Sequence, residues 1–157
     1  YPGIFRKNFA FERWKDFDEE LFESLYNDDS HEREFTHRIY GSDISPRSID
    51  IATQNIKSAG VAKYIDLKIM SIQRYETAPS PEGILITNPP YGERIMEKQE
   101  AEQLYRLFGD AWRKTENWKL YLLSSHTEFE RTFGKTADKK RKLYNGMIKC
   151  DLFMYLK

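Results

Sequence analysis

The sequence predicts an α/β fold that ends in a β-hairpin. Short β-branched runs alternate with stretches whose apolar residues recur at helical spacing. The run over residues 83–87 is followed by Asn88 and then by two consecutive prolines. Near the end of the chain, Asn145-Gly146 separates two extended runs. With 157 residues, 39% of them hydrophobic, the chain can form one domain with a core.

The stretch from Ile84 to Gly92 is the one around which the other predicted elements are arranged. Residues 83–87 are uncharged and rich in β-branched side chains, as expected for a central strand buried on both faces. Pro89 and Pro90 have no N–H to donate, so they end the strand in a rigid bend. In open α/β sheets, ligands bind at the carboxyl ends of strands, so we expect the site here.

The residues of this bend suit a planar group that carries an NH2. Asn88 offers a side-chain carbonyl, Pro89 offers a backbone carbonyl, and Tyr91 offers a flat ring for stacking. A sharp turn without a ligand would use the same residue types. The residues alone leave both interpretations open.

The elements follow in order from periodicity and from residues that favour helix ends. Residues 1–14 are predicted to be irregular, with Phe9, Phe11 and Trp14 packing against the sheet. The other predicted elements are helices over 16–34, 46–59 and 101–114, strands over 38–43, 64–70, 83–87 and 118–123, and a hairpin built from runs near 142–144 and 148–156.

Two helix starts have recognisable caps. Ser45 is a good N-cap, and Pro46 suits the first helical position. Residues 125–128 have the spacing of a capping box and predict a short helix that ends at Gly134. His126 is therefore expected to be an exposed first-turn residue rather than a catalyst.

Charge and composition limit the classes of function. The 25 basic and 25 acidic residues balance, yet acids predominate in residues 1–34 and bases in residues 131–149. The basic stretch is either a phosphate contact or a solvated hairpin. No run reaches membrane-spanning length, no metal-ligand spacing occurs, and the single Cys150 fits a reducing cytoplasm.

Asn88-Pro89-Pro90-Tyr91 resembles the catalytic signature of S-adenosylmethionine-dependent methyltransferases that modify exocyclic or amide nitrogens. The longer stretch 87–95 is similar to the N2-guanine methyltransferases of 23S ribosomal RNA that carry an RNA-binding THUMP domain. Residues 6–14 and 139–146 resemble further segments of the same family. The resemblance implies a Rossmann-like class I methyltransferase sheet with an antiparallel closing hairpin.

This resemblance also implies roles for individual residues. Asn88, Pro89, Pro90 and Tyr91 would form the catalytic loop, with Asn88 also touching the cofactor. The cofactor-binding residues would be Asp43, bonded to the ribose hydroxyls of S-adenosylmethionine; Ile44, lying against the adenine; and Ser71, which stands where many relatives have an adenine-binding Asp. From residues alone, Asp43 would be an ordinary strand-end Asp.

The same family leads us to expect that residues 1–157 are a partial catalytic domain. The family's first strand and glycine-rich cofactor loop have no counterpart here, so we expect the chain alone to be inactive. Ribosomal RNA would bind through a THUMP domain absent from this sequence. Further contacts could come from four basic residues: Lys139, Lys140, Arg141 and Lys142.

Three other functions remain open at this stage. The four-residue motif also serves N6-adenine methyltransferases and protein-glutamine methyltransferases. A non-catalytic fragment that keeps the fold is the third alternative.

Overall fold

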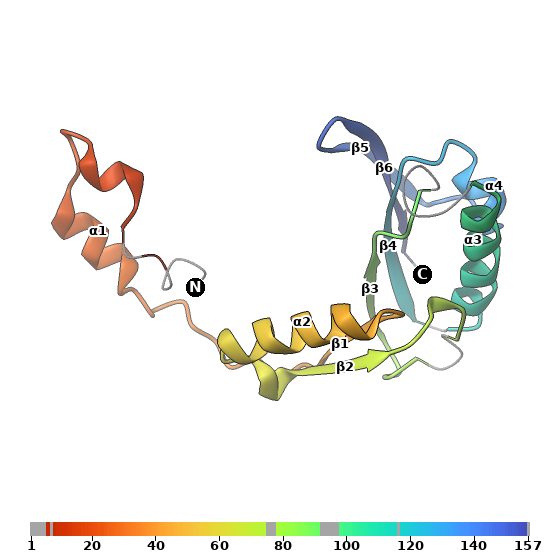
Figure 1. The fold of residues 1–157 in the computed structure, drawn as a ribbon, viewed down its shortest axis with the longest axis horizontal. Coiled ribbons are helices and arrows are strands. Elements are labelled where there is room, and N and C mark those ends of the chain that lie inside the picture. Colours follow the sequence, from red (N-terminus) through yellow and green to blue (C-terminus); the bar gives the residue numbers. More distant parts are fainter. Residues whose placement is uncertain (1–5, 7, 75–77, 92–97, 116, 157) are drawn as a thin grey trace. The chain divides into compact units, whose positions relative to one another are not determined.

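The computed structural model describes residues 6, 8–74, 78–91, 98–115 and 117–156 (Figure 1). Its elements in chain order are η2 (Ala10–Arg13), α1 (Glu19–Tyr26), β1 (Ile39–Asp43), α2 (Pro46–Ser58), η3 (Ala62–Tyr64), β2 (Ile65–Ile69), η4 (Ile72–Arg74), β3 (Gly83–Thr87), α3 (Lys98–Arg113), β4 (Trp118–Ser124), α4 (Phe129–Phe133), β5 (Lys139–Asn145) and β6 (Ile148–Tyr155).

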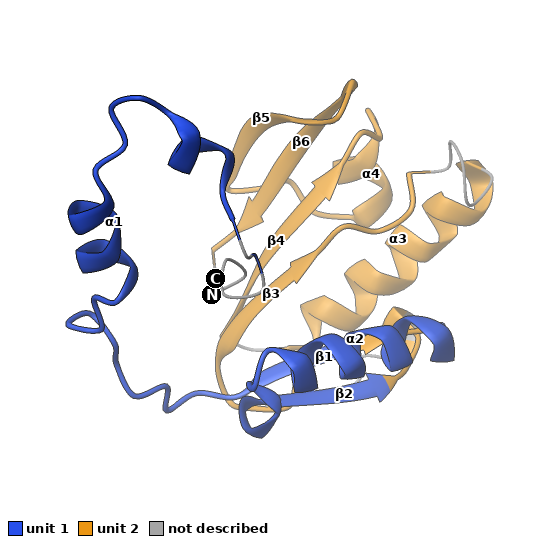
Figure 2. Cartoon of the chain, turned by 60° about the vertical axis from the view of Figure 1, so that its left-hand side comes forward, with its two compact units in different colours: residues 1–41, 45–68 blue, residues 42–44, 69–157 orange. Residues whose placement is uncertain are grey.

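The chain divides into two compact units (Figure 2). Unit 1 comprises residues 1–41 and 45–68, and unit 2 comprises residues 42–44 and 69–157. The predicted catalytic and cofactor-binding residues all belong to unit 2.

Unit 2 is built on a four-stranded sheet in the order β3-β4-β6-β5. β3 and β4 run parallel, with Leu85 opposite Leu120. β6 runs antiparallel to both β4 and β5. The predicted antiparallel closing hairpin is therefore confirmed. Helices α3 and α4 lie on one face of this sheet (Figures 1 and 2).

The core of unit 2 is an aromatic layer between these helices and the sheet. Strand alternation turns Leu120 and Leu122 of β4 toward the helices. The Trp112 indole N–H donates to the Trp118 carbonyl at 3.2 Å, which satisfies a polar group inside the layer. The buried aromatic residues are Tyr105, Phe108, Trp112, Phe129, Phe133, Phe153 and Tyr155.

The opposite face of β3 differs from the prediction. Ile84 and Ile86 are 60% and 79% exposed, whereas Leu85 packs on the core. Among the strands that the structure describes, β3 has β4 as its one neighbour, so it lies at the edge of its sheet. Composition predicted burial on both faces, but the described residues bury only one.

The hairpin turns one residue later than the sequence indicated. Asn145 is paired with Ile148, so the two-residue loop consists of Gly146 and Met147. Gly146 has a φ of 63°, which is favourable at the first central position of a type II′ turn.

Helix α4 also begins later than predicted, because its N-cap is Glu128. No side-chain hydrogen bond caps this helix among the described residues, so the expected capping box is absent. Its end is as predicted, since Gly134 takes a left-handed conformation with a φ of 80°.

Unit 1 contains α2 and most of the two-stranded β1-β2 sheet, whose strand ends at residues 42–43 and 69 belong to unit 2. The N-cap of α2 is the predicted one. Ser45 accepts a hydrogen bond from the Ser48 N–H at 3.3 Å, and Pro46 follows as the first helical residue. Arg38 and Asp66 form an ion pair at 3.1 Å.

The aromatic residues near the start of unit 1 contact one another and helix α1. Phe9 and Phe11 stack with ring centroids 5.2 Å apart, and both contact Phe22 of α1. Trp14 is mostly exposed. Helix α1 has eight residues, starting after the N-cap Asp18, and is shorter than the predicted helix over 16–34. These aromatics therefore form a local cluster with α1.

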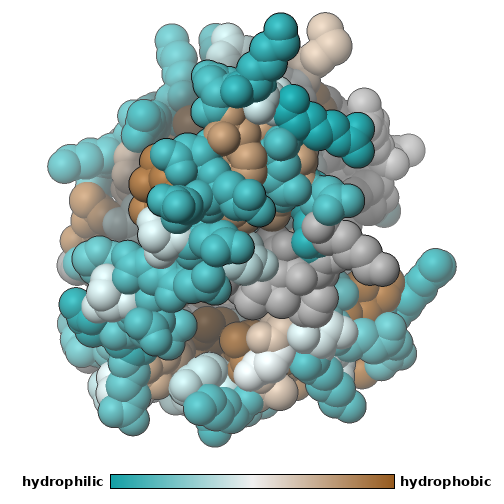
Figure 3. Space-filling view, turned by 90° about the vertical axis from the view of Figure 1, so that its left-hand side faces the viewer, coloured by the Kyte–Doolittle hydropathy of each residue, from teal (hydrophilic) through white to brown (hydrophobic). Residues whose placement is uncertain are grey.

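Polar side chains predominate on one face of the molecule. Hydrophilic residues cover most of the face visible in Figure 3, and hydrophobic residues show between them in smaller patches. The mean hydropathy of −0.75 agrees with such a surface. Within the described residues, every helix is too short or too polar to cross a membrane.

We predict that Gly109→Ala destabilises unit 2 through a steric clash. A Cβ on Gly109 would lie 2.2 Å from the Phe133 carbonyl oxygen, so α3 and α4 would have to separate. We expect a loss of about 1–3 kcal/mol in the free energy of unfolding, measured by urea denaturation. Gly146→Ala is the control, because it has open space but a positive φ, and should cost about 1 kcal/mol. An unchanged midpoint for Gly109→Ala would contradict the close approach.

Candidate active site

The loop after β3 brings the predicted catalytic residues together. Pro89 is buried, and Asn88 is exposed at the carboxyl end of the strand. The Tyr91 hydroxyl donates a hydrogen bond to Asn88 Oδ1. An amide oxygen has two lone pairs, so this bond leaves one for a ligand N–H. It also fixes which way the Asn88 amide points.

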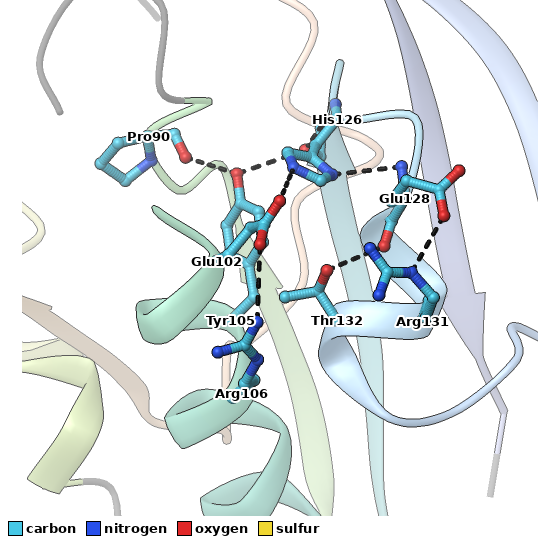
Figure 4. Close-up of polar contacts among 9 residues, drawn as sticks. Pro90, Glu102, Tyr105, Arg106, His126, Glu128, Arg131 and Thr132 are labelled. Atoms are coloured by element: carbon cyan, nitrogen blue, oxygen red, sulfur yellow. Dashed lines mark hydrogen bonds and ion pairs between the residues drawn. The ribbon is translucent and has the colours of Figure 1, made fainter. Parts of the chain in front are cut away.

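The other side of the loop is supported by α3. The Tyr105 hydroxyl donates to the Pro90 carbonyl oxygen and lies 3.5 Å from Ser124 Oγ (Figure 4). Sequence reasoning did not anticipate this support. It requires the first turns of α3 to pack beside the end of β4, which no local pattern specifies.

Tyr91 extends toward the closing hairpin. Burial raises the pKa of its phenol; Cys150 raises the pKa further, while a hydrogen bond with Asn145 opposes the shift. The phenol is therefore neutral at physiological pH and remains a hydrogen-bond donor.

The position of Cys150 shows which face of the sheet Tyr91 lies on. In β6, Phe153 contacts Phe129 of α4, with ring centroids 4.6 Å apart. Cys150 is three residues away, so its side chain is on the opposite face. Tyr91 thus lies on the face of the sheet that α3 and α4 leave uncovered.

The predicted cofactor residues follow β1 and β2. Asp43 ends β1, and its carbonyl accepts the Met70 N–H at 3.0 Å, which joins the ends of the two strands. Ile44 is 73% exposed, and Ser71 directly precedes η4, whose Ile72 packs on the core. A carboxylate, an exposed apolar side chain and a hydroxyl have the chemistry to bind a ribose and an adenine ring.

His126 is buried, which corrects the prediction of an exposed first-turn residue. It is 7% exposed, and its ring packs edge-on against Tyr105 with centroids 5.6 Å apart. The Glu128 N–H donates to His126 Nδ1 at 3.2 Å. In the neutral tautomer the proton is therefore on Nε2, which lies 3.2 Å from Glu102 Oε1 (Figure 4).

One signal in the sequence could have indicated this partner. Glu102 follows the buried Ala101 and lies one turn before the buried Tyr105. An acid beside the apolar stripe of a helix needs a hydrogen-bond partner once the helix packs.

The basic residues of β5 are divided between the two faces of the sheet. Lys140 is paired with Phe153 and donates to Glu130 at 2.6 Å, so it faces α4. Because side chains alternate, Lys142 shares that face. Lys139 and Arg141 lie on the opposite face, the one on which Tyr91 lies.

Comparison with known proteins identifies the family. Residues 1–153 match the UPF0020 family, described as RMKL-like, methyltransferase domain. The chain belongs to this family.

Two curated relatives of this methyltransferase domain are similar over nearly the whole chain. YpsC of Bacillus subtilis (strain 168), named as a candidate RNA methyltransferase, is 35% identical over 156 residues; these are 98% of this chain and 40% of YpsC. A protein of Shewanella amazonensis (strain ATCC BAA-1098 / SB2B), named ribosomal RNA large subunit methyltransferase K/L, is 35% identical over 160 residues, covering 98% of this chain and 22% of that protein.

Solved structures agree with the class I methyltransferase fold. The crystal structure of a possible methylase from Clostridium difficile 630 has a TM-score of 0.88 and 42% identity, covering 99% of this chain and 41% of that one. The crystal structure of SMU.472 complexed with SAH has a TM-score of 0.86 and 36% identity, with the same coverage. The chain thus spans less than half the length of these relatives.

We predict that Glu130 makes the stability of unit 2 sensitive to acid. Burial alone would raise the pKa of Glu130, but hydrogen bonds from Lys140 and from the Ala137 N–H outweigh it and hold the pKa below the ordinary 4.5. This stabilisation is complete above about pH 4.5 and is lost as the pH falls through the lower folded value.

Glu130→Gln should therefore lower the melting temperature at pH 7 and flatten its fall below pH 4.5. Gln keeps an oxygen for the Ala137 N–H but loses the charge. Thermal melts between pH 3 and pH 7 would measure this, with the exposed Glu100→Gln as control. The same slope in Glu130→Gln and the wild type would contradict the assignment.

Proposed function

We propose that this protein transfers a methyl group from S-adenosylmethionine to an exocyclic amino nitrogen, namely N2 of a guanine in 23S ribosomal RNA. The observation that carries the proposal is the Asn88–Tyr91 loop, which presents an oriented amide oxygen beside an aromatic ring at the end of β3. Family membership and the names of the relatives support it. We expect the reaction in the cytoplasm, where ribosomal RNA is found.

The loop would bind and orient the target amine. Asn88 Oδ1 and the Pro89 carbonyl would each accept one amino hydrogen, and the Tyr91 ring would stack on the base. As the nitrogen becomes cationic, both oxygens hold it more tightly than they hold the neutral amine, which lowers the barrier. Two consecutive prolines reduce the reorganisation that this geometry would cost.

The residues after β1 and β2 would hold the cofactor. Asp43 would accept hydrogen bonds from the ribose hydroxyls, Ile44 would contact the adenine, and Ser71 would bond the adenine edge. When bound, S-adenosylmethionine supplies a methyl group on a sulfonium, an electrophile that requires no metal.

The first experiment tests cofactor binding and substrate class together. S-adenosylmethionine is titrated calorimetrically into the 157-residue chain and into YpsC whose matched segment is replaced by this chain. Radiolabelled methyl transfer is then measured on ribosomal RNA and on adenine and glutamine substrates. Methylguanine in the RNA supports the proposal, whereas transfer to adenine or glutamine assigns the loop to those chemistries. Binding by neither protein favours a non-catalytic fold.

We predict that Asn88→Ala in the chimera loses transfer much more than cofactor binding. Removing one oriented acceptor should lower kcat by about 10²–10³-fold, while the Kd of S-adenosylmethionine changes little. Asn55→Ala, at an exposed site of α2, serves as control and should retain full activity. Equal losses of binding and transfer would reject the catalytic assignment of Asn88.

We also infer that Lys139 and Arg141 contact RNA phosphates, since they share a sheet face with Tyr91. Replacing both with Gln should weaken RNA binding by the chimera. It should also reduce the slope of log K against log salt by about 1–2. Lys140→Gln is the matched control, because that ammonium is paired with Glu130 on the other face. Equal effects in both variants would contradict this orientation.

A further inference from the structure

A chain of hydrogen bonds leads from β4 to the proposed catalytic loop (Figure 4). The His126 main-chain N–H donates to Ser124 Oγ at 3.1 Å, Ser124 Oγ lies 3.5 Å from the Tyr105 hydroxyl, and that hydroxyl contacts the Pro90 carbonyl. A carbonyl oxygen can only accept, so the single proton of Tyr105 points to Pro90. Ser124 must then donate to Tyr105, and the chain has one direction.

Burial strengthens this chain. Tyr105 is 0% exposed and Ser124 is 1% exposed, so water does not compete for their hydroxyls. Burial raises the pKa of the Tyr105 phenol, while the hydrogen bond with Ser124 opposes the shift. Tyr105 therefore remains protonated and donating at neutral pH.

The ring of Tyr105 is itself held in place. Phe129 packs against it at 69° with centroids 5.0 Å apart, and His126 packs against it at 83°. The His126 ring is fixed in turn by the Glu128 N–H and by Glu102. Phe129 and His126, which contact the Tyr105 ring, are themselves held by other residues. Such supporting contacts keep the residues of a site in a fixed orientation.

The atom that Tyr105 contacts controls the direction of Tyr91. The rings of Pro89 and Pro90 fix both φ angles, and ψ of Pro89 is restricted because a proline follows it. The main remaining rotation before Tyr91 is therefore ψ of Pro90. That rotation turns the Pro90 carbonyl and the Tyr91 N–H together, because they belong to one planar peptide. A hydrogen bond to the carbonyl therefore sets the direction in which Tyr91 leaves the loop.

We propose that Tyr105 is a positioning residue for methyl transfer: its hydrogen bond to Pro90, supported by Ser124, fixes the Pro90–Tyr91 peptide and so holds Tyr91 against the target base. The proposal rests on the proposed function, since Tyr91 has a substrate to hold only in that reaction.

The direct test is an NMR measurement on the full 157-residue chain. The sequence contains one Pro that is followed by Tyr, at positions 90 and 91. Labelling proline carbonyls with ¹³C and tyrosine nitrogens with ¹⁵N therefore gives a single correlation, which comes from this peptide. Tyr105→Phe removes the hydrogen bond to the carbonyl, and both shifts of that correlation should move.

Tyr155→Phe is the matched control. Tyr155 is also 0% exposed, belongs to the same aromatic core, and donates to a backbone carbonyl, that of Lys135, at 3.0 Å. Removing the Tyr155 hydroxyl removes a hydrogen bond of comparable strength, but this hydrogen bond is to Lys135 and not to the loop after β3. The Pro90–Tyr91 correlation should stay where it is in this variant.

Kinetics of the chimera separate positioning from a general loss of structure. Tyr105→Phe should lower kcat about three- to tenfold with the Kd of S-adenosylmethionine unchanged, which corresponds to one hydrogen bond used for orientation. Ser124→Ala leaves Tyr105 in place and should give a smaller change in the same direction, both in kcat and in the correlation. Tyr155→Phe should retain the wild-type kcat.

The outcomes of these measurements either support or overturn the positioning role of Tyr105. A correlation unmoved by Tyr105→Phe, or an equal loss of kcat in Tyr155→Phe, overturns the positioning role. If Tyr105→Phe does not fold, Ser124→Ala decides by the same two readouts. An active wild type with an unaffected Tyr105→Phe rejects this inference alone, whereas a wild type that transfers no methyl group rejects the proposed function and the positioning role with it.

Discussion

The packing of α3 and α4 against one face of the four-stranded sheet is the interaction on which unit 2 depends. Trp112 contacts both Phe133 and Tyr155, and Phe129 packs on Phe153, so the helices and the closing hairpin share one aromatic layer. The close approach requires Gly109, which has no side chain to hold α3 away from α4. Because α3 is fixed in this way, Tyr105 reaches the loop after β3.

Polar groups enter this core only with partners. Both ring nitrogens of His126 form hydrogen bonds, with Glu102 and with the Glu128 N–H. The Ser124 hydroxyl accepts the main-chain N–H of His126 and contacts the Tyr105 hydroxyl. A buried polar group without a hydrogen-bond partner in this core would lower the free energy of unfolding about as much as the loss of an apolar contact does. The polar chain is therefore compatible with stability while it stiffens the loop that carries Asn88.

The two faces of the four-stranded sheet carry different residues. On the helix side, Lys140 and Glu130 attach β5 to α4. On the other side lie Tyr91, Cys150 and the exposed Ile84 and Ile86. Strand alternation makes this division, since neighbouring residues of β5 point to opposite faces. A run of four basic residues therefore acts as two separate pairs.

The sequence by itself determined the local features. Two prolines after 83–87 had to end a strand, Ser45-Pro46 had to begin a helix, and Gly134 and Gly146 marked a helix end and a turn, because each depends on the φ angle or the N–H of one residue. The loop of Asn88 and Tyr91 could be predicted for the same reason. Only the tertiary structure decided the burial of His126, the exposed face of β3, the division of the basic residues and the support from Tyr105. These depend on which elements pack together, and a pattern along one segment does not contain that information.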